Sequence, residues 1–408
     1  MRETFAAGKT KSYEWRVSQL KAVLKITEHH EKAIMDALFS DLSKPELESF
    51  VHEETLVSAF HQIPIPLTPV KYYLLSLDPV IGAIAAGNAV VLKTIRSCPS
   101  HIISLLCQTV QRLYGYHCSK GNGKVGRIVM AAAAKHLTPV VLELGGKCPV
   151  VVDSNINLKV AARRIIAGKW GCNSGQACIA PDYIITTKEN ALQLLDVMKV
   201  ELDKFYGKDP LCSVDLSRIV NSNHFYRLTK LLDDDKVSGK IVHGGQRDEK
   251  KLKIAPTILM DVPEDALIMK EEIFGPLLPI LTVNKVEDSL RIINGRDKPL
   301  AAYLFTSNKK LEQEFVTNLS AGGLLINDTA LHVAVHTLPF GGVGESGTGS
   351  YHGKFSFEAF THKKAVLKRS FGGDLSARYP PYTPKKGRLL RALLSGNLIF
   401  IIRALLGL

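Results

Sequence analysis

Two cysteines lie six residues apart, Cys172 and Cys178, within the run GKWGCNSGQACIAPDY. The two thiols could bind a metal, form a disulfide or pack in the core, or one of them could be a nucleophile. Gly175 and Gln176, the small and polar residues just before Cys178, leave its sulfur accessible, and an accessible thiolate is a strong nucleophile. The spacing alone leaves all four alternatives open.

The whole set of cysteines narrows these alternatives. The chain has seven cysteines, an odd and widely spaced set that contains no C-x-x-C pair. This pattern argues against a disulfide framework and against a structural zinc site, and it is typical of a reducing compartment. We therefore predict no bound metal. The cysteines stand at positions 98, 107, 118, 148, 172, 178 and 212.

The composition is that of an ordinary soluble globular protein, with 46% hydrophobic and 22% charged residues among 408. A chain of this length accommodates two or three domains. The formal net charge of +13 is scattered, and no basic stripe with interleaved aromatic residues is present. We therefore predict no nucleic-acid partner. The N-terminal sequence has no apolar core of signal-peptide type, which favours a cytoplasmic location.

The hydrophobic pattern predicts an α/β architecture. Apolar residues recur at intervals of three and four through residues 2–41, which indicates helices, whereas the prolines of 63–70 exclude a long helix. Beyond residue 79, strands and helices alternate to about residue 330, as in mostly parallel sheets. We expect helices at 79–88, 127–137, 190–206 and 288–296, and strands at 89–93, 139–147 (running into a glycine turn), 149–153, 183–187 and 277–283.

The segment GNGKVG, residues 121–126, matches the G-x-G-x-x-G pattern of dinucleotide-binding proteins. Glu143 lies about twenty residues further on, where that pattern places a ribose ligand. The preceding GYHCSK does not have the pattern of a strand, and we do not assign Glu143 this role. Gly121 and Gly126 are still expected near phosphate, because glycines at a helix N-terminus let backbone amides approach an anion.

Four segments occur together and in order: LELGGK (142–147), NSGQACIAPDY (173–183), EEIFGP (271–276) and LPFGGVGESGTGSYHG (338–353). This set resembles the aldehyde dehydrogenase superfamily, and its last segment is similar to the class 3 branch. The resemblance implies an α/β fold with a Rossmann-like coenzyme domain and an α/β catalytic domain. The implied parts are N-terminal helices with a partial NAD(P)-binding domain (1–143), the catalytic domain (144–336), a tunnel and oligomerisation segment (337–380) and a basic, apolar tail (381–408).

The resemblance also implies a reaction, the NAD(P)-dependent oxidation of aldehydes to carboxylic acids. Cys178, directly after Gly-Gln-Ala, resembles the nucleophile that forms a thiohemiacetal and, after hydride transfer to NAD or NADP, a thioester. Glu143 resembles the general base that activates water, a role that suits a partly desolvated glutamate. Cys172 is expected to be a small buried thiol, and His352 a structural histidine without an acidic partner in its motif. The scheme requires Cys178 and Glu143 to face one cavity.

Further residues match coenzyme contacts of the family. Glu272 and Phe274 match residues that hold the nicotinamide ribose and ring, and Lys93 matches the lysine that contacts the adenosine ribose. Three positions after that lysine the family commonly has an acidic residue, and here it is Arg96. A guanidinium pairs well with phosphate, which favours tolerance of NADP. The expected cofactor-binding residues are Lys93, Arg96, Gly121, Gly126, Glu272 and Phe274.

Two blocks of the family pattern are missing from this sequence. Before SLDPVIGAIAAGN (76–88), the family has a W-N-F-P segment whose asparagine donates a hydrogen bond to the developing oxyanion. Before GNGKVG, the family has a strand that ends in F-T-G-S. We therefore expect an eroded coenzyme domain. Loss of one oxyanion donor typically lowers a rate ~10²–10³-fold, so the alternative function is a catalytically impaired homologue with a binding or membrane-surface role.

The tail at 381–408 combines a basic patch with an apolar stretch that Arg391, Asn397 and Arg403 interrupt. A membrane-spanning helix needs ~20 nearly uncharged residues, which this stretch lacks. Two alternatives remain, an amphipathic helix on a membrane surface and a tail packed on the protein or on a second subunit. The resemblance implies a homodimer that acts on a small-molecule aldehyde.

Overall fold

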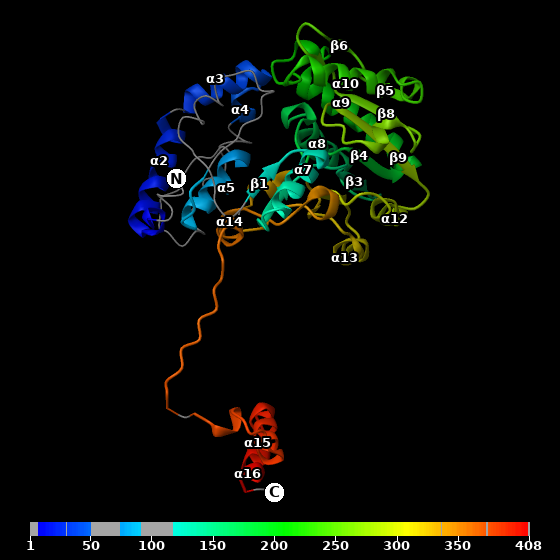
Figure 1. The fold of residues 1–408 in the computed structure, drawn as a ribbon. Coiled ribbons are helices and arrows are strands. Elements are labelled where there is room, and N and C mark those ends of the chain that lie inside the picture. Colours follow the sequence, from blue (N-terminus) through cyan, green and yellow to red (C-terminus); the bar gives the residue numbers. More distant parts are fainter. Residues whose placement is uncertain are drawn as a thin grey trace. The chain divides into compact units, whose positions relative to one another are not determined.

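The computed structural model describes residues 7–29, 31–49, 74–90, 117–335, 337–372 and 374–406. The chain divides into two compact units, Met1–Thr361 and His362–Leu408. The first unit contains a seven-stranded sheet with a three-stranded and a two-stranded sheet, and the second contains two helices (Figure 1). The proline-dense segment and the two predicted adenosine contacts, Lys93 and Arg96, lie outside the described residues, as does most of the strand expected at 89–93.

The large sheet has the order β11-β10-β3-β4-β9-β8-β5 and is parallel except for the edge strand β5, which runs antiparallel to β8. Its inner strands are almost entirely buried, as expected for a parallel sheet covered on both faces. The expected strands at 149–153, 183–187 and 277–283 are all present. The strands of this sheet are β3 (Pro149–Val152), β4 (Tyr183–Thr187), β5 (Ile241–His243), β8 (Thr257–Met260), β9 (Leu277–Val283), β10 (Ala301–Phe305) and β11 (Gly323–Ile326).

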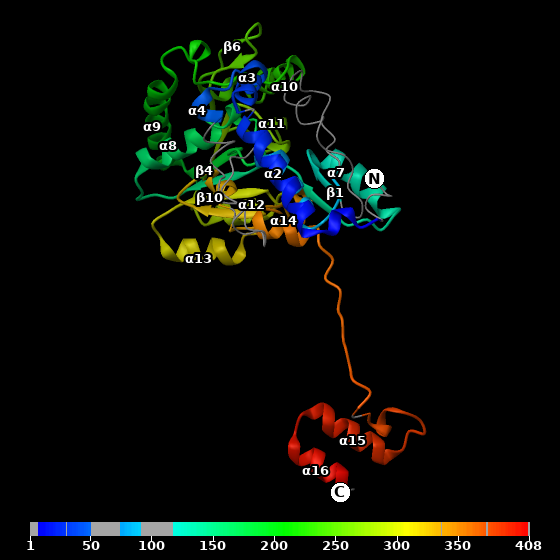
Figure 2. The ribbon, with the colours of Figure 1, turned by 90° about the vertical axis from the view of Figure 1, so that its left-hand side faces the viewer.

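Hydrophobic cores lie on both faces of this sheet. Along β3, Val150 and Val152 belong to one core and Val151 to the other, because successive side chains of a strand point to opposite faces. α8 and α9 cover the first face, and α10, α12 and α13 contribute to the second core (Figure 2). The helices are α8 (Leu158–Lys169), α9 (Lys188–Tyr206), α10 (Ser222–Asp233), α11 (Leu267–Lys270), α12 (Asp288–Asn294) and α13 (Lys309–Asn318).

A smaller sheet joins β1 (His117–Lys120), β2 (Val140–Glu143) and β12 (Gly347–Thr348) in the order β1-β2-β12. β1 runs parallel to β2, and α7 (Gly123–Ala134) follows it after a turn at Gly121. The sequence-based prediction that no strand precedes the glycine motif is therefore wrong. β1 has no apolar alternation of its own, and its pairing with β2 stabilises it as a strand.

The N-terminal helices form a third core with the C-terminal end of the first unit. α5 (Leu74–Ala85) packs against α14 (Gly353–Ala359), and Gly82 permits this approach because an added Cβ would lie 2.3 Å from the Cβ of Ser356. These helices confirm the predictions for 2–41 and 79–88. The other elements of the unit are α2 (Tyr13–His29), α3 (Glu31–Leu42), α4 (Glu46–Ser49), β6 (Arg247–Asp248) and β7 (Lys253–Ile254).

The second unit contains α15 (Pro384–Ser395) and α16 (Leu398–Leu406), separated by a turn in which Gly396 has a φ of 65°. Thr383 caps α15, since its side chain accepts a hydrogen bond from the backbone N–H of Lys386. Apolar side chains of the pair are exposed, and none of the helices that the structure describes is long and apolar enough to span a membrane. The exposed side chains include Leu394, Leu398, Ile399, Phe400 and Ile402.

Candidate active site

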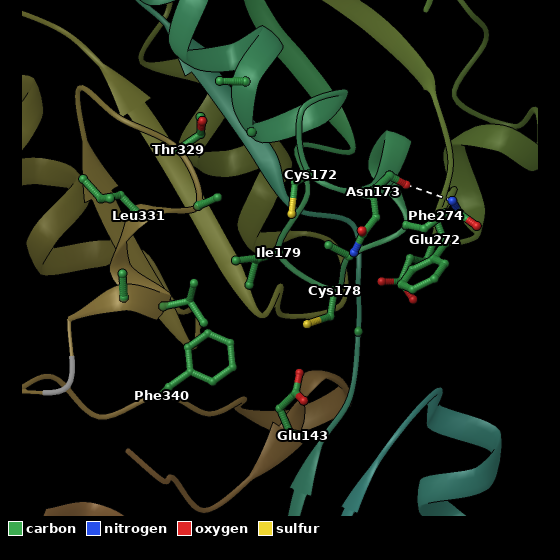
Figure 3. Close-up of a pocket in the computed structure, with 18 of the residues that line it drawn as sticks. Glu143, Cys172, Asn173, Cys178, Ile179, Glu272, Phe274, Thr329, Leu331 and Phe340 are labelled. Carbon is green, nitrogen blue, oxygen red and sulfur yellow. Dashed lines mark hydrogen bonds between the residues drawn. The ribbon is translucent and has the colours of Figure 1, made fainter. Parts of the chain in front are cut away.

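A cavity of about 1250 Å³ in the first unit is lined by both Cys178 and Glu143. Figure 3 shows the sulfur of Cys178 and the carboxylate of Glu143 pointing into the same space. Phe340 lies to one side of them, and Glu272 and Phe274 lie to the other. The geometric requirement placed on Cys178 and Glu143 is met, because one cavity holds both side chains.

Cys178 lies in the loop that follows α8, and the backbone of this loop is tightly constrained. Ser174 and Gly175 both have positive φ, of 51° and 78°. A Cβ on Gly175 would lie 2.3 Å from the carbonyl oxygen of Gly275, so only glycine fits this approach. The side chain of Gln176 donates a hydrogen bond to the carbonyl oxygen of Arg218 at 2.9 Å. These contacts fix the loop before Cys178 and thereby the position of its sulfur.

The environment of Cys178 favours the neutral thiol. Burial, followed by the negative charge of Glu143, raises the pKa of Cys178 well above the usual range of a thiol. A resting thiol must therefore lose its proton when it attacks. Cys172 lines the same cavity and is 8% exposed, as expected for a small buried thiol.

Glu143 ends β2 and is 3% exposed. Its Oε2 lies 3.5 Å from the hydroxyl of Tyr351, which donates to it, and 3.9 Å from Nζ of Lys120. Its Oε1 is buried, and no hydrogen-bond partner for it is found among the described residues. One carboxylate oxygen is thus anchored, and the other is available to accept a proton inside the cavity.

Glu272 and Phe274 form the opposite wall. The Glu272 carboxylate packs onto Gly145, where an added Cβ would lie 2.2 Å from both carboxylate oxygens. Burial, followed by the charge of Asp182, raises the pKa of Glu272 to about 7. Glu271 is partly exposed and pairs with Arg227 at 3.1 Å.

The two glycines of the 121–126 motif occupy different environments. Gly121 lines the cavity, and an added Cβ there would meet nothing within 4 Å. Gly126 is buried inside α7, where an added Cβ would lie 2.9 Å from the methyl groups of Leu144. The structure therefore places Gly126 in the packing between α7 and the strand end, apart from the cavity lining. Among the residues that the structure describes, no cluster could hold a metal ion.

Sequence reasoning missed three residues that contact Glu143 or His352. Lys120 and Tyr351 contact its carboxylate, and Asp78 pairs with the buried His352 at 3.6 Å. No acidic residue is adjacent to His352 in its motif, but the fold brings an acidic partner from a distant helix. No sequence signal could have identified these pairs, because each joins segments far apart in the chain.

The comparisons with known proteins agree with this arrangement. The family model described as the aldehyde dehydrogenase family matches residues 119–366. This chain belongs to the aldehyde dehydrogenase family. In this aldehyde dehydrogenase, the region matched by the model includes the cavity residues Cys178, Glu143, Glu272 and Phe340.

Similar proteins support the class 3 branch. The chain is 55% identical over 464 positions to an aldehyde dehydrogenase of Craterostigma plantagineum, with 100% of this chain and 97% of the relative covered. It is 53% identical to aldehyde dehydrogenase family 3 member H1 of Arabidopsis thaliana, with 100% and 96% covered. The dimeric NADP-preferring aldehyde dehydrogenase of Rattus norvegicus is 40% identical, with 95% and 97% covered. The alignment with the Craterostigma relative spans 464 positions, more than the 408 residues of this chain. This difference agrees with internal blocks that are missing from this chain.

A solved structure confirms the fold. The chain is similar to the substrate-bound state of Staphylococcus aureus AldH, with a TM-score of 0.86 and 35% identity over 96% of this chain and 97% of that one. The aldehyde dehydrogenase fold predicted from the four motifs is therefore correct.

A buried ion pair joins three of those motifs in this aldehyde dehydrogenase. Lys147, which follows the glycines of LELGGK, pairs with Asp182, and the two side chains are only 11% and 4% exposed. Nζ of Lys147 also donates to the carbonyl oxygens of Ile268 at 2.8 Å and Glu271 at 3.0 Å. Asp182 in turn accepts a hydrogen bond from the backbone N–H of Ile273 at 3.0 Å. The pair thus holds the Cys178 loop, the Glu143 strand end and the Glu272 segment together.

We expect Lys147→Met and Asp182→Asn each to lower the free energy of unfolding by about 3–5 kcal/mol, because each leaves a buried charge without its partner. The double variant should cost less than the sum of the single variants. Urea unfolding followed by fluorescence measures these values. Lys310→Met, which breaks the exposed pair with Glu314, is the matched control and should cost about 0.5 kcal/mol or less. Unfolding midpoints equal to wild type in both single variants would contradict the role of the pair.

Proposed function

We propose that this aldehyde dehydrogenase oxidises aldehydes to carboxylic acids with NAD or NADP as hydride acceptor, using Cys178 as nucleophile and Glu143 as general base. The observation that carries the proposal is the single cavity into which both side chains point (Figure 3). Membership of the aldehyde dehydrogenase family supports the reaction class.

The first step belongs to Cys178. Its Sγ adds to the aldehyde carbon to form a thiohemiacetal, and its proton must leave because the resting group is a thiol. Oε1 of Glu143 is available to accept that proton. A nicotinamide held beside Glu272 and Phe274 would supply the hydride acceptor, and loss of hydride from the thiohemiacetal would leave a thioester on Cys178. After Glu143 has released the first proton to solvent, it takes a proton from water as the water oxygen adds to the thioester carbon. The C–S bond then breaks, the acid leaves, and the Cys178 sulfur recovers a proton from Glu143.

The residues present fit the coenzyme. The β1–Gly121–α7 turn presents open glycine backbone and helix amides at the cavity, which suits phosphate. Glu272 and Phe274 line the wall opposite Phe340, which suits the ribose and ring of the nicotinamide. We extend the proposal to Lys93 and Arg96 as further coenzyme-binding positions, but not to Gly126, which packs on Leu144 apart from the cavity lining.

The substrate side of the cavity is apolar. Ile179, Leu331 and Phe340 lie together on one side of Cys178 (Figure 3). Burial of apolar surface stabilises binding in proportion to the area covered. The substrates that fit this wall are aliphatic or aromatic aldehydes, with the carbonyl group at Cys178.

Each part of the chain is proposed to contribute a different part of the site. Residues 1–143 contribute the coenzyme side, 144–336 the catalytic loop, 337–380 the substrate tunnel and subunit contacts, and 381–408 the tail. We propose a homodimer, which the printed name of the dimeric rat relative supports. A cytoplasmic location is supported by the described cysteines, none of which is in a disulfide: 118, 148, 172, 178 and 212.

Cys178→Ser is expected to lower aldehyde-dependent formation of NADH or NADPH at least about 10³-fold, because the hydroxyl is a far weaker nucleophile. Cys172→Ser, at the neighbouring cavity thiol, is the matched control and should retain most of the activity. Glu143→Gln should slow both the first turnover and the steady state, because Glu143 is proposed to accept the proton of the Cys178 thiol as well as that of water. Absorbance at the reduced-cofactor band measures all three variants. Full activity in Cys178→Ser would refute the mechanism.

Arg96→Glu is expected to lower kcat/KM for NADP relative to NAD by about tenfold or more, because a charge-assisted hydrogen bond to the 2′-phosphate is lost. The ratio of the two kcat/KM values at fixed aldehyde concentration measures the effect. A ratio unchanged from wild type would assign the preference to other residues.

The tail is proposed to bind an anionic membrane surface. α15 and α16 expose apolar side chains such as Leu398 and Phe400, and the segment from residue 375 to the end contains no acidic residue. Apolar exposure combined with basic residues is typical of interfacial helices. The exposed apolar side chains would enter the lipid while Arg388 and Arg391 remain at the headgroups.

We expect the full chain to sediment with phosphatidylserine-containing vesicles and less with neutral vesicles. Arg388→Gln with Arg391→Gln should weaken this binding about thirtyfold, since each basic residue near such a surface contributes about 1 kcal/mol. Lys309→Gln with Lys310→Gln removes the same charge from α13 and should leave vesicle binding unchanged. If both double variants weakened vesicle binding equally, or if the wild-type protein did not sediment with vesicles, the membrane proposal would be wrong. The tail would then be assigned to packing on the protein or on a second subunit.

A further inference from the structure

Lys120 is the last residue of β1 and lies opposite Glu143 in the register of the parallel pair β1–β2. Paired residues of adjacent strands direct their side chains to the same face of the sheet. Accordingly, Nζ of Lys120 lies 3.9 Å from Oε2 of Glu143, and it donates a hydrogen bond to the Tyr351 hydroxyl at 2.8 Å. It also lies 4.2 Å above the centroid of the Tyr351 ring. Lys120 lines the same cavity as Cys178.

The other positively charged side chains of the described cavity lining pair with other carboxylates. Arg227 binds Glu271 and is therefore engaged away from Glu143. The pairs are Arg163 with Glu201 at 3.9 Å, Arg164 with Asp328 at 3.7 Å and Arg227 with Glu271 at 3.1 Å. Lys120 is thus the cation of the described lining that contacts the Glu143 carboxylate.

The cavity has an excess of acidic groups around its thiol. A Cys178 thiolate would form beside the Glu143 carboxylate, and Glu272 adds a second acid within electrostatic range. Like charges in a buried site disfavour one another, whereas a cation in the same site favours both anions. The positive charge of Lys120 acts on Cys178 in the direction opposite to Glu143 and lowers the pKa that burial raises.

We propose that Lys120 is a positioning residue that supplies the compensating positive charge of this active site. With Tyr351 it anchors one oxygen of Glu143, and its ammonium stabilises a Cys178 thiolate beside that carboxylate. The inference rests on the proposed function, in which these two groups are base and nucleophile.

The titratable groups around Lys120 and Cys178 determine the pH range in which the proposal can be tested. Burial raises the pKa of Asp78, which also faces Lys120, to about 7, and the pKa of Glu272 is raised to a similar value. Between pH 7.5 and 10, roughly, both carboxyl groups are ionised, so changes there report mainly on the thiol. The groups facing Cys178 or Lys120 are Asp78, Cys118, Glu143, Glu272 and Tyr351.

The test is the rate at which iodoacetamide alkylates Cys178 in the full chain without cofactor, followed by mass spectrometry across this pH range. Lys120→Met should slow alkylation across this pH range, about tenfold or more at pH 8, because the loss of an opposite charge from the same buried cavity disfavours the thiolate. Lys120→Arg keeps the charge and should recover most of the difference. Lys135→Met, at an exposed lysine just after α7, is the matched control and should alkylate at the wild-type rate.

The charges of the pair should act in opposite directions. Glu143→Gln should speed alkylation of Cys178, and adding Lys120→Met to it should return the rate toward wild type. If Lys120→Met alone does not fold, the effect of the ammonium is measured instead as the difference in alkylation rate between Glu143→Gln and the double variant. Thermal unfolding of each variant establishes that it is folded.

Two results would overturn the proposal. The first is an alkylation profile that Lys120→Met leaves unchanged, with no difference between Glu143→Gln and the double variant. The second is Lys120→Arg slowing alkylation as much as Lys120→Met, which would indicate packing rather than charge. Neither measurement requires turnover. A wild-type protein that fails to oxidise aldehydes would therefore refute the proposed function separately from the charge effect on Cys178.

Discussion

The buried pair of Lys147 and Asp182 is the constraint on which the cavity depends. Charges removed from water remain charged only where partners are fixed, and here backbone groups of Ile268, Glu271 and Ile273 complete the arrangement. The pair ties a strand end, a loop and a short helix at one point. Since Glu143, Cys178 and Glu272 each lie within a few residues of this point, their separations follow from it.

Around this pair, close backbone packing removes the remaining freedom. Gly175 approaches Gly275, and Gly145 accommodates the Glu272 carboxylate, at distances that no side chain at either glycine would permit. Ser174 and Phe274 hold positive φ values of 51° and 48°, which cost energy and persist only where neighbouring contacts impose them. The thiol and the carboxylates are therefore held in place by backbone that has little room to move.

The same enclosure creates the electrostatic problem of the site. Burial raises the pKa of Cys178, so the resting cavity favours the neutral form of a thiol that must lose its proton during the reaction. Lys120 adds a positive charge beside Glu143, and Tyr351 orients it through a hydrogen bond. The chemistry of the cavity thus depends on a few charges whose positions are set by strand register.

The sequence by itself determined the family, the α/β architecture and the residue types that carry the chemistry. These signals are local: Cys178 after Gly-Gln-Ala, Glu143 before two glycines, and buried strands such as β3 each occupy a short contiguous segment. Only the tertiary structure decided the strand β1, which depends on pairing with β2, and the packing of Gly126 on Leu144. It alone also joined Lys120 to Glu143 and Asp78 to His352. Such contacts arise from strand register and helix packing between distant segments, and no short stretch of sequence encodes them.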